Sequence, residues 1–368
     1  MADDPMVPYM HVFWQGSDIS SSVNAVEIED HDLLIDRATI ELNDDKGVGT
    51  NLSEEGQTIK IDMGWNSEHA VLFEGLTHKP EGKANQKGKT LRITAFDFSD
   101  KLHRKYRSDT YKGKLSDIIT KLVKDKNIEM GQIAPDSDPT FDKDPLAQTN
   151  ETDLQFIQRL ARKYRARAFV EYNDDKSKFY FIPVKKFLDI KQGLMRYCRG
   201  TPLLEFNYKK IAKRADALRD DSRVDPYTGD IINSKAPEPP LPPAPTLDAE
   251  TTGALASSGM TSLGDSAEKA VKDAPEKRTE QMTQQTASGG ASDPDEAQLA
   301  NQQDPTRAMG LFGKGTVVGT IKLRAKGTVK IEGIAQWAEG DWYVAVVKHI
   351  YRKLPDKPLY HTKFFVTR

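Results

Sequence analysis

Residues 148–164 read QTNETDLQFIQRLARKY, a helix-start signal that runs directly into an amphipathic face. Asn150 is expected to cap the helix, because its side-chain oxygen can accept a hydrogen bond from a first-turn N–H group, and Asp153 favours the positive end of the helix dipole. One apolar stripe follows, formed by Leu154, Ile157, Ala161 and Tyr164 and widened by Phe156 and Leu160. The stretch therefore predicts a helix from Thr149 to Tyr164 with one buried face.

The first hundred residues are typical of a β domain, because short runs of β-branched and aromatic residues alternate with turn signals. Turns are expected at 16–18 and at the Lys-rich and Gly-rich segment 79–88. The predicted strands are His11–Trp14, Val23–Ile28, Ala38–Leu42, Thr58–Met63, Val71–Phe73 and Leu91–Phe96. Short strands at this spacing predict a small closed barrel or sandwich over residues 1–100.

Residues 101–200 combine helical and strand patterns and predict a small α+β domain. Apolar residues at helical spacing follow Ser116, a suitable N-cap, and predict a helix that ends near Lys126. After the helix at 149–164, two strand-like runs at 168–172 and 178–183 surround a turn at 173–175 and predict a hairpin.

A change in composition marks residues 221–308, which are predicted to be a disordered Pro-rich insertion. Their only aromatic residue is Tyr227, so they cannot bury enough apolar surface to offset the entropy of ordering. Strand patterns resume near Gly315. Residues 201–220 and 309–368 are therefore expected to form one β domain that the insertion interrupts, since closing a long loop adds little entropy cost.

Composition excludes several classes of site. The 368 residues include 53 basic and 55 acidic side chains, for a formal charge of −2. Such a balance provides no general field for nucleic acid or an anionic membrane. Cys198 is the only cysteine, which excludes an intrachain disulfide. The acidic N-terminus indicates that there is no secretion signal, and the lack of a long apolar run indicates that there is no membrane anchor.

Three strings, in the same order, resemble phage late control protein D, the central hub of contractile-tail baseplates. The first includes Gly75 and Asp97 in the N-terminal strands. The second is the helix string with Gln148, Asn150, Asp153, Leu154, Phe156, Leu160, Ala161 and Tyr164. The third lies in the C-terminal strands and includes Gly333, Gly340, Trp342 and His349.

This resemblance implies a mainly β, α+β fold in which two small tube-like β-barrels flank an α+β domain. It also implies a non-enzymatic homotrimer that adapts a hexameric tail tube to a separate trimeric spike and forms part of the delivery channel. Other partners would be a tube-initiator protein, the tape measure and baseplate wedge proteins. The chain would be made in the host cytoplasm and assembled into a virion tail or an injection particle.

Two alternatives remain open at this stage: a tail-associated peptidoglycan hydrolase, and the hub of a non-phage contractile injection system. Asp97 lies between two phenylalanines, where its pKa could be raised as in a catalytic acid. We instead expect Asp97 to point outward from its strand, and His349 to be a hydrogen-bonded structural histidine. The sequence has no nucleotide-binding or hydrolase motif, and we predict no cofactor and no metal site.

Two further segments allow two interpretations each. The cations between Lys101 and Lys114 have the composition of a nucleic-acid patch, but a solvated linker explains them equally well, and sequence-specific DNA binding is not expected. The prolines between Pro237 and Pro245 could dock in an aromatic groove, but a stiff spacer is the simpler interpretation.

Overall fold

The computed structural model describes residues 7–86, 88–197, 203–210, 220–224, 231–234, 286–287 and 311–368. Its internal contacts divide the chain into two compact units, of which the first contains Met1–Asn207, Gly313–Lys330 and Asp341–Val366 and the second contains Tyr208–Phe312, Ile331–Gly340 and Thr367–Arg368. No helix in the described ranges is both long and apolar enough to cross a membrane.

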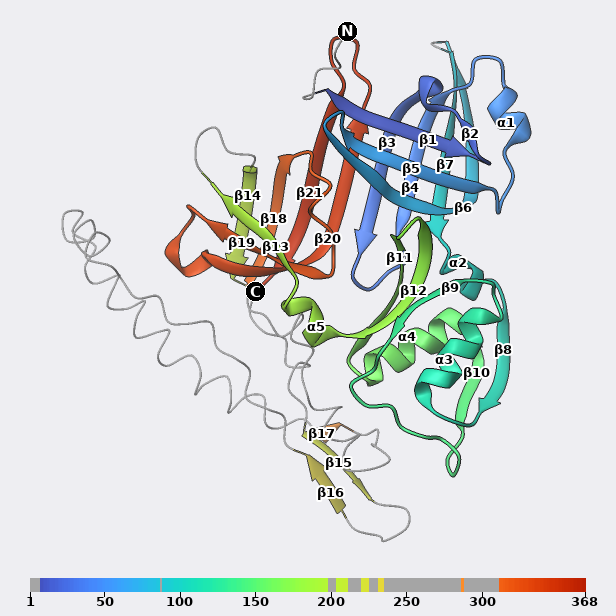
Figure 1. Ribbon diagram of the computed structural model, residues 1–368, viewed down its shortest axis with the longest axis vertical. Coiled ribbons are helices and arrows are strands. Elements are labelled where there is room, and N and C mark those ends of the chain that lie inside the picture. The colour runs from blue at the N-terminus through green and yellow to red at the C-terminus, as the bar shows by residue number, and fades with distance from the viewer. Residues whose placement is uncertain are drawn as a thin grey trace, which may run out of the picture. The chain divides into compact units, whose positions relative to one another are not determined.

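The N-terminal part of the first unit is a run of antiparallel strands (Figure 1). Its strands are β1 (Pro8–Trp14), β2 (Ser17–Asp18), β3 (Val23–His31), β4 (Arg37–Asn43), β5 (Thr58–Trp65), β6 (Glu68–Asn85) and β7 (Gly88–Asp97). A one-turn 3-10 helix, Ser20–Ser22, and the short helix α1 (Val48–Leu52) lie in connections. The strands predicted from period-2 patterns are all present.

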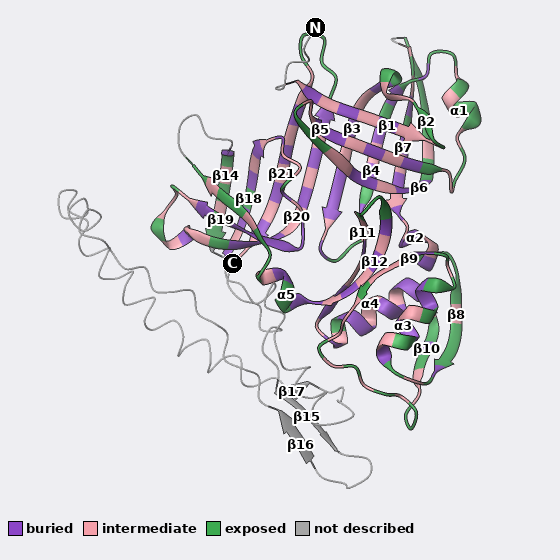
Figure 2. Ribbon diagram, viewed as in Figure 1, coloured by how far each residue is buried: buried purple, intermediate pink, exposed green. Residues whose placement is uncertain are grey.

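Alternating burial along these strands positions the core (Figure 2). In β4 the inward residues Ala38 and Ile40 are fully buried, whereas Arg37 and Glu41 are exposed. The paired strand β7 matches this register, with Ile40 opposite Ile93. Because side chains on one face repeat every second residue, this pairing collects the aliphatic residues on a single face.

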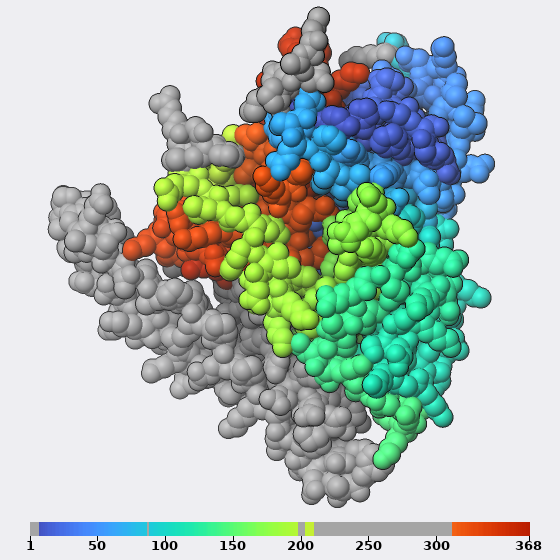
Figure 3. Space-filling model, in the orientation of Figure 1, coloured from blue at the N-terminus to red at the C-terminus, as the bar shows by residue number. Residues whose placement is uncertain are grey.

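The C-terminal strands extend the same sheet. They are β13 (Lys191–Arg196), β14 (Leu203–Lys210), β18 (Leu311–Val318), β19 (Gly327–Glu332), β20 (Gly340–Arg352) and β21 (Leu359–Thr367). Strand β20 pairs antiparallel with β3, and His349 lies opposite Ile28. Figure 3 accordingly shows red C-terminal residues directly beside blue N-terminal residues.

The β3–β20 pair changes the expected architecture of two separate closed barrels. The strands form one 13-stranded sheet with the order β14-β18-β21-β20-β3-β4-β7-β6-β5-β1-β2, and β19 branches from β20 to β13. Among the described strands, no pairing closes the N-terminal or the C-terminal strands into a separate barrel. The mainly β, α+β class predicted from the sequence is confirmed, whereas closure of the barrels is not observed.

The α+β part of the first unit lies between these two β regions in the sequence. Its helices are α2 (Asp100–His103), α3 (Leu115–Lys124), α4 (Asp153–Lys163) and α5 (Val184–Leu188), and its strands are β8 (Tyr106–Tyr111), β9 (Glu129–Ile133), β10 (Leu146–Thr152), β11 (Ala166–Asn173) and β12 (Lys176–Pro183). The predicted hairpin is confirmed as β11 and β12, which β9 joins in parallel.

Two local predictions were wrong because hydrogen-bond partners elsewhere in the fold decide the local structure. Segment 79–88 was expected to be a turn, but β6 pairs with β7 as far as Asn85, opposite Gly88, so the turn is much tighter. Ser116 was expected to cap α3, but Lys114 is the N-cap residue. The Ser116 N–H group instead donates to Asp138 Oδ1 at 2.8 Å, so a side chain from a distant loop satisfies the helix start.

Gly75 is required by a close approach of strands β6 and β7. A Cβ atom at this position would overlap the carbonyl oxygen of Phe96 and lie 2.8 Å from the carbonyl carbon. Because the obstacle is backbone, we expect Gly75→Ala to reduce the free energy of unfolding by about 1–3 kcal/mol or more. Urea unfolding measures this change. Gly82→Ala on the same strand is the control, since its nearest atom is a movable Thr50 methyl group at 3.2 Å, and an equal loss in both variants would contradict the argument.

The second unit is described only in part. Its backbone includes the short strands β15 (Asp220–Val224), β16 (Ile231–Ser234) and β17 (Thr286–Ala287). A 3-10 helix, Gln336–Ala338, carries Trp337, whose ring packs edge-on against Tyr208 at 5.2 Å between centroids. Most of the predicted disordered insertion 221–308, including Pro237 to Pro245, lies outside the described residues.

Candidate functional site

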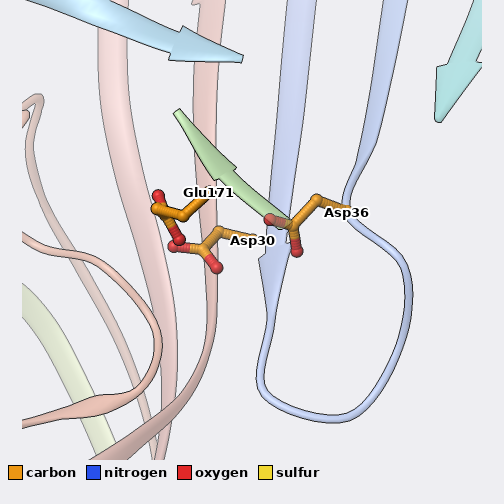
Figure 4. A group of neighbouring side chains, drawn as sticks. All are labelled: Asp30, Asp36 and Glu171. Atoms are coloured by element: carbon orange, nitrogen blue, oxygen red, sulfur yellow. The ribbon is translucent and has the colours of Figure 1, made fainter. Parts of the chain in front are cut away.

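Three carboxylates from separate elements of the first unit meet where strands β3 and β11 approach each other (Figure 4). Asp30 lies near the end of β3, Asp36 ends the β3–β4 connection, and Glu171 lies on β11. One oxygen from each lies within 4.8 Å of the others. Asp30 and Asp36 are 1% and 7% exposed, so their mutual repulsion is poorly screened.

Two cations from the segment before β19 offset part of the negative charge of this cluster. Lys326 Nζ lies 2.6 Å from Asp30 Oδ1, and Arg324 Nε lies 2.9 Å from Asp30 Oδ2. Arg324 also donates to Glu171 Oε1. Burial by itself would raise the pKa of Asp30, but the charges of Lys326 and Arg324 outweigh it and hold that pKa far below its usual range. We call Asp30, Asp36, Glu171, Arg324 and Lys326 the ion-pair junction.

A second buried pair lies beside the junction. Arg167 of β11 is 3% exposed and donates from Nε to Asp32 Oδ1 at 2.6 Å. The hydroxyl of Tyr343 on β20 donates to the same oxygen at 2.8 Å. Through charge-assisted hydrogen bonds to Asp32, Arg167 and Tyr343 connect the loop after β3 with β11 and with β20.

The chemistry of the junction is structural. Three convergent carboxylates resemble a ligand set for a divalent cation, but the chain's own ammonium and guanidinium groups bind the oxygens of Asp30 and Glu171. Lys326 also has a positive φ of 65° and lies 4.9 Å from the centroid of the Phe169 ring. A lysine held in this unfavourable backbone conformation indicates that its side-chain contacts fix the path of the segment.

The expectation that Asp97 points outward was wrong. Asp97 lies on the same face of β7 as the buried Ile93 and Ala95 and is 5% exposed. Its Oδ2 accepts from the Asp36 N–H group at 2.8 Å and its Oδ1 accepts from the Ser99 N–H group at 2.6 Å. Burial raises the pKa of Asp97 to about 6 against these hydrogen bonds. Its carboxylate is therefore occupied by backbone groups.

His349 is buried in the C-terminal strands. It is 0% exposed, and its Nδ1 lies 3.1 Å from the Tyr360 hydroxyl. Burial lowers the pKa of His349 to about 3, so the ring is neutral at physiological pH. These contacts are those of a hydrogen-bonded structural histidine.

The cap predicted for the central helix was wrong by two residues. Strand β10 continues to Thr152 because it pairs with β8, and Asn150 sits in a bulge with φ of 48°. Thr152 is the N-cap, and it exchanges hydrogen bonds with Gln155 in a capping box. Asp153 is consequently the first helical residue instead of the third.

This capping box provides a direct test of the helix start. We expect Thr152→Ala to lower the free energy of unfolding by about 1 kcal/mol, because the Gln155 N–H group loses its acceptor. Thermal unfolding followed by circular dichroism measures the change. Thr152→Ser keeps the hydroxyl and should be close to wild type, and a serine variant as unstable as the alanine variant would refute a capping role.

The polar residues of the helix string form a buried network. Asp153 is 1% exposed and accepts from Arg107 Nε at 2.6 Å and from Gln148 Nε2 at 3.2 Å. Tyr111 donates its hydroxyl hydrogen to Gln148 Oε1 at 2.9 Å. The apolar members face the core, and all are at most 5% exposed: Leu154, Phe156, Leu160, Ala161 and Tyr164. Arg107 belongs to the basic segment 101–114, and its guanidinium is used inside the fold.

The residues singled out from the sequence do not form one site. Gly75 and Asp97 lie opposite each other on β6 and β7, and Trp342 is fully buried on β20 beside Phe206. In the second unit, the Gly333 N–H group donates to Glu339 Oε1, and Gly340 has φ of 127°. These are packing and turn positions.

Sequence reasoning missed the ion-pair junction. Lys326 and Asp30 are 296 residues apart, and neither belongs to a motif. One signal was present, because the run Glu29-Asp30 interrupts the period-2 alternation of a strand whose other inward residues are apolar. Two adjacent acids in such a strand require a buried partner, although the pattern does not identify it.

Comparison with known proteins identifies solved structures with a similar fold. A family model described as the Alg8 N-terminal domain matches residues 6–180. None of the curated protein sequences matches this chain. The tail protein from Neisseria meningitidis MC58 is similar in structure, with a TM-score of 0.63, 10% identity and coverage of 98% of this chain and 97% of that chain.

Two further structures are similar over nearly the whole of this chain. The 43 kDa tail protein of prophage MuSo2 from Shewanella oneidensis has a TM-score of 0.64 and 11% identity, with 98% of each chain covered. A component of the E. coli type VI secretion system, described as structurally similar to the T4 bacteriophage tail proteins gp27 and gp5, has a TM-score of 0.57, 11% identity and coverage of 97% of this chain and 76% of that chain. The predicted resemblance to tail proteins is thus confirmed at the level of the fold.

Proposed function

We propose that this chain, which has the fold of bacterial and prophage tail proteins, is a structural subunit of a tail tip. The observation that carries the proposal is similarity over nearly the full length of both chains to the two bacterial tail proteins. A match of this extent includes both β regions and the α+β part. The similarity is therefore not limited to one common domain.

The proposed role is a homotrimeric hub between a hexameric tail tube and a separate trimeric spike. Each chain would contribute two β regions to a ring, so that three copies present six similar surfaces through heterologous contacts that close. The β3–β20 pairing and the ion-pair junction support this role, because they fix the two β regions of one chain against each other and against the α+β part. The tube-initiator, tape measure and wedge proteins are further proposed partners in the virion tail.

The mass of the purified chain in solution tests the proposal. We expect light scattering behind a sizing column to give a trimer of three times 41.2 kDa that persists on dilution. Electron microscopy of the trimer should then show a ring with a central opening. A monomer at every concentration, also when mixed with a trimeric spike, would contradict the hub role.

The E. coli relative supports a second setting for the same role, a non-phage contractile injection system. Pull-down of spike and tube proteins from the source organism distinguishes the two settings by the identity of the partners. The hydrolase alternative is tested by zymography on peptidoglycan. A clearing band that disappears in Asp97→Asn would favour the enzyme over the non-enzymatic hub.

A further inference from the structure

The ion-pair junction and its neighbour Asp97 contain more acids than bases. Four carboxyl groups lie in this region, and two cations face them: Asp30, Asp36, Asp97 and Glu171 against Arg324 and Lys326. All are buried except Glu171 and Arg324, which are partly buried. If all six groups were ionised, the region would carry two uncompensated negative charges. Uncompensated charge in a poorly solvated region is costly, and carboxyl groups avoid that cost by binding protons.

Asp30 and Glu171 take both cations. Asp30 binds Lys326 through Oδ1 and Arg324 through Oδ2, and the Ala325 N–H group adds a third hydrogen bond at 2.9 Å. Glu171 binds Arg324 through Oε1, and its Oε2 lies 3.8 Å from Lys326 Nζ. The two cations therefore stabilise the ionised form of Asp30, and their remaining contacts go to Glu171.

Asp36 is compensated least. Asp97 receives backbone N–H groups on both oxygens. Among the described residues, the Asp36 carboxyl group accepts one hydrogen bond, which the His31 N–H group donates to Oδ1 at 2.8 Å. The charged groups that face it are Asp30 from β3, Asp97 from β7, Glu171 from β11, and Lys326 and Arg324 from the segment before β19.

We propose that this region keeps one proton at neutral pH, held on the carboxyl group of Asp36, and that loss of this proton weakens the attachment of segment 323–326 to β3 and β11. An ionised Asp36 would compete with Asp30 and Glu171 for Lys326 and repel both acids. The protonated form leaves the two cations to their partners. The junction is thus a proton-linked lock between the C-terminal and central parts of the first unit.

The direction of the pH dependence follows from burial. Burial raises the pKa of Asp36 well above its usual range, opposed by Lys326 and reinforced by Asp30, Asp97 and Glu171. A carboxyl group with a raised folded-state pKa contributes stability that is fully present below its unfolded pKa and is lost as the pH rises through the folded pKa. The lock should therefore be strongest in mildly acidic solution and weaken on the alkaline side.

Two measurements on the full chain test the lock. Infrared spectroscopy should show the C=O stretch of a protonated carboxyl group at neutral pH, and this band should be absent in Asp36→Asn. Thermal unfolding from about pH 5 to about pH 10 should show the wild-type Tm falling by about 2–4 °C per pH unit across the titration. The asparagine side chain keeps an acceptor for the His31 N–H group and cannot ionise, so the Asp36→Asn variant should lose that slope.

Glu41→Gln is the matched control, because Glu41 is an exposed acid on β4, the strand that follows Asp36. It should keep both the infrared band and the slope. A wild-type spectrum without the band would overturn the proposal, as would a band that disappears in Asp97→Asn and persists in Asp36→Asn. If Asp36→Asn does not fold, the band in the wild type and its persistence in Asp97→Asn and Glu171→Gln decide the question.

Discussion

Replacing Lys326 by methionine should destabilise the protein more than any other single change considered above, by about 3–5 kcal/mol in the free energy of unfolding. Methionine approximates the length of the lysine side chain but removes its charge. Asp30, which is 1% exposed, would then keep only Arg324 as a cationic partner. Urea unfolding of the full chain, followed by tryptophan fluorescence and circular dichroism, measures the loss.

An exposed lysine close in sequence provides the control. Lys322 pairs with Glu68 at 3.1 Å, but the two side chains are 69% and 54% exposed. Exposed pairs are worth at most about 1 kcal/mol, so Lys322→Met should be nearly neutral. The double variant Asp30→Asn with Lys326→Met should recover part of the loss, because it removes the unpaired charge. A Lys326→Met variant as stable as Lys322→Met would refute the structural importance of the junction.

The second large effect is expected at Phe156. This ring is 0% exposed, and its centroid lies 5.3 Å from that of Tyr111 on β8. Phe156→Ala removes most of a buried aromatic side chain and leaves a cavity between α4 and the sheet. We therefore expect a loss of about 3–5 kcal/mol, measured as a shift of the urea midpoint with an unchanged slope.

Tyr106 is a suitable comparison, since it is an aromatic residue on β8, the strand that carries Tyr111, and it is 59% exposed. Tyr106→Ala should change the free energy of unfolding by less than about 1 kcal/mol. If both alanine variants lost the same stability, burial of the helix face would not explain the effect. A soluble Phe156→Ala variant that forms the proposed trimer would also separate folding of the α+β part from assembly.

Local pattern was sufficient for much of the fold. Alternating residues located the strands around Ile40 and Ile93, and helical spacing located both long helices of the α+β part. The buried face of α4, including Phe156 and Leu160, also followed from spacing alone. These features depend on residues close together in sequence, whose faces are fixed by the period of the backbone.

Pairing between strands overrode the local signals elsewhere. Asparagine is a favoured N-cap residue, so Asn150 was expected to cap the helix. The hydrogen bonds between β10 and β8 instead extend the strand to Thr152. The local preference for a cap is worth only about 1 kcal/mol, which several strand hydrogen bonds outweigh. Asp97 was assigned to the wrong face, although the alternation through Ile93 and Ala95 already placed it inward.

The sequence by itself therefore determined the mainly β, α+β class, the position of most elements and the resemblance to tail hubs. Only the tertiary structure decided that β3 and β20 join the two β regions into one sheet, and that Lys326 meets Asp30 across 296 positions. The reason is physical: periodicity fixes which face of an element is buried, whereas the partner of a buried charge is fixed by which distant segments the folded chain brings together.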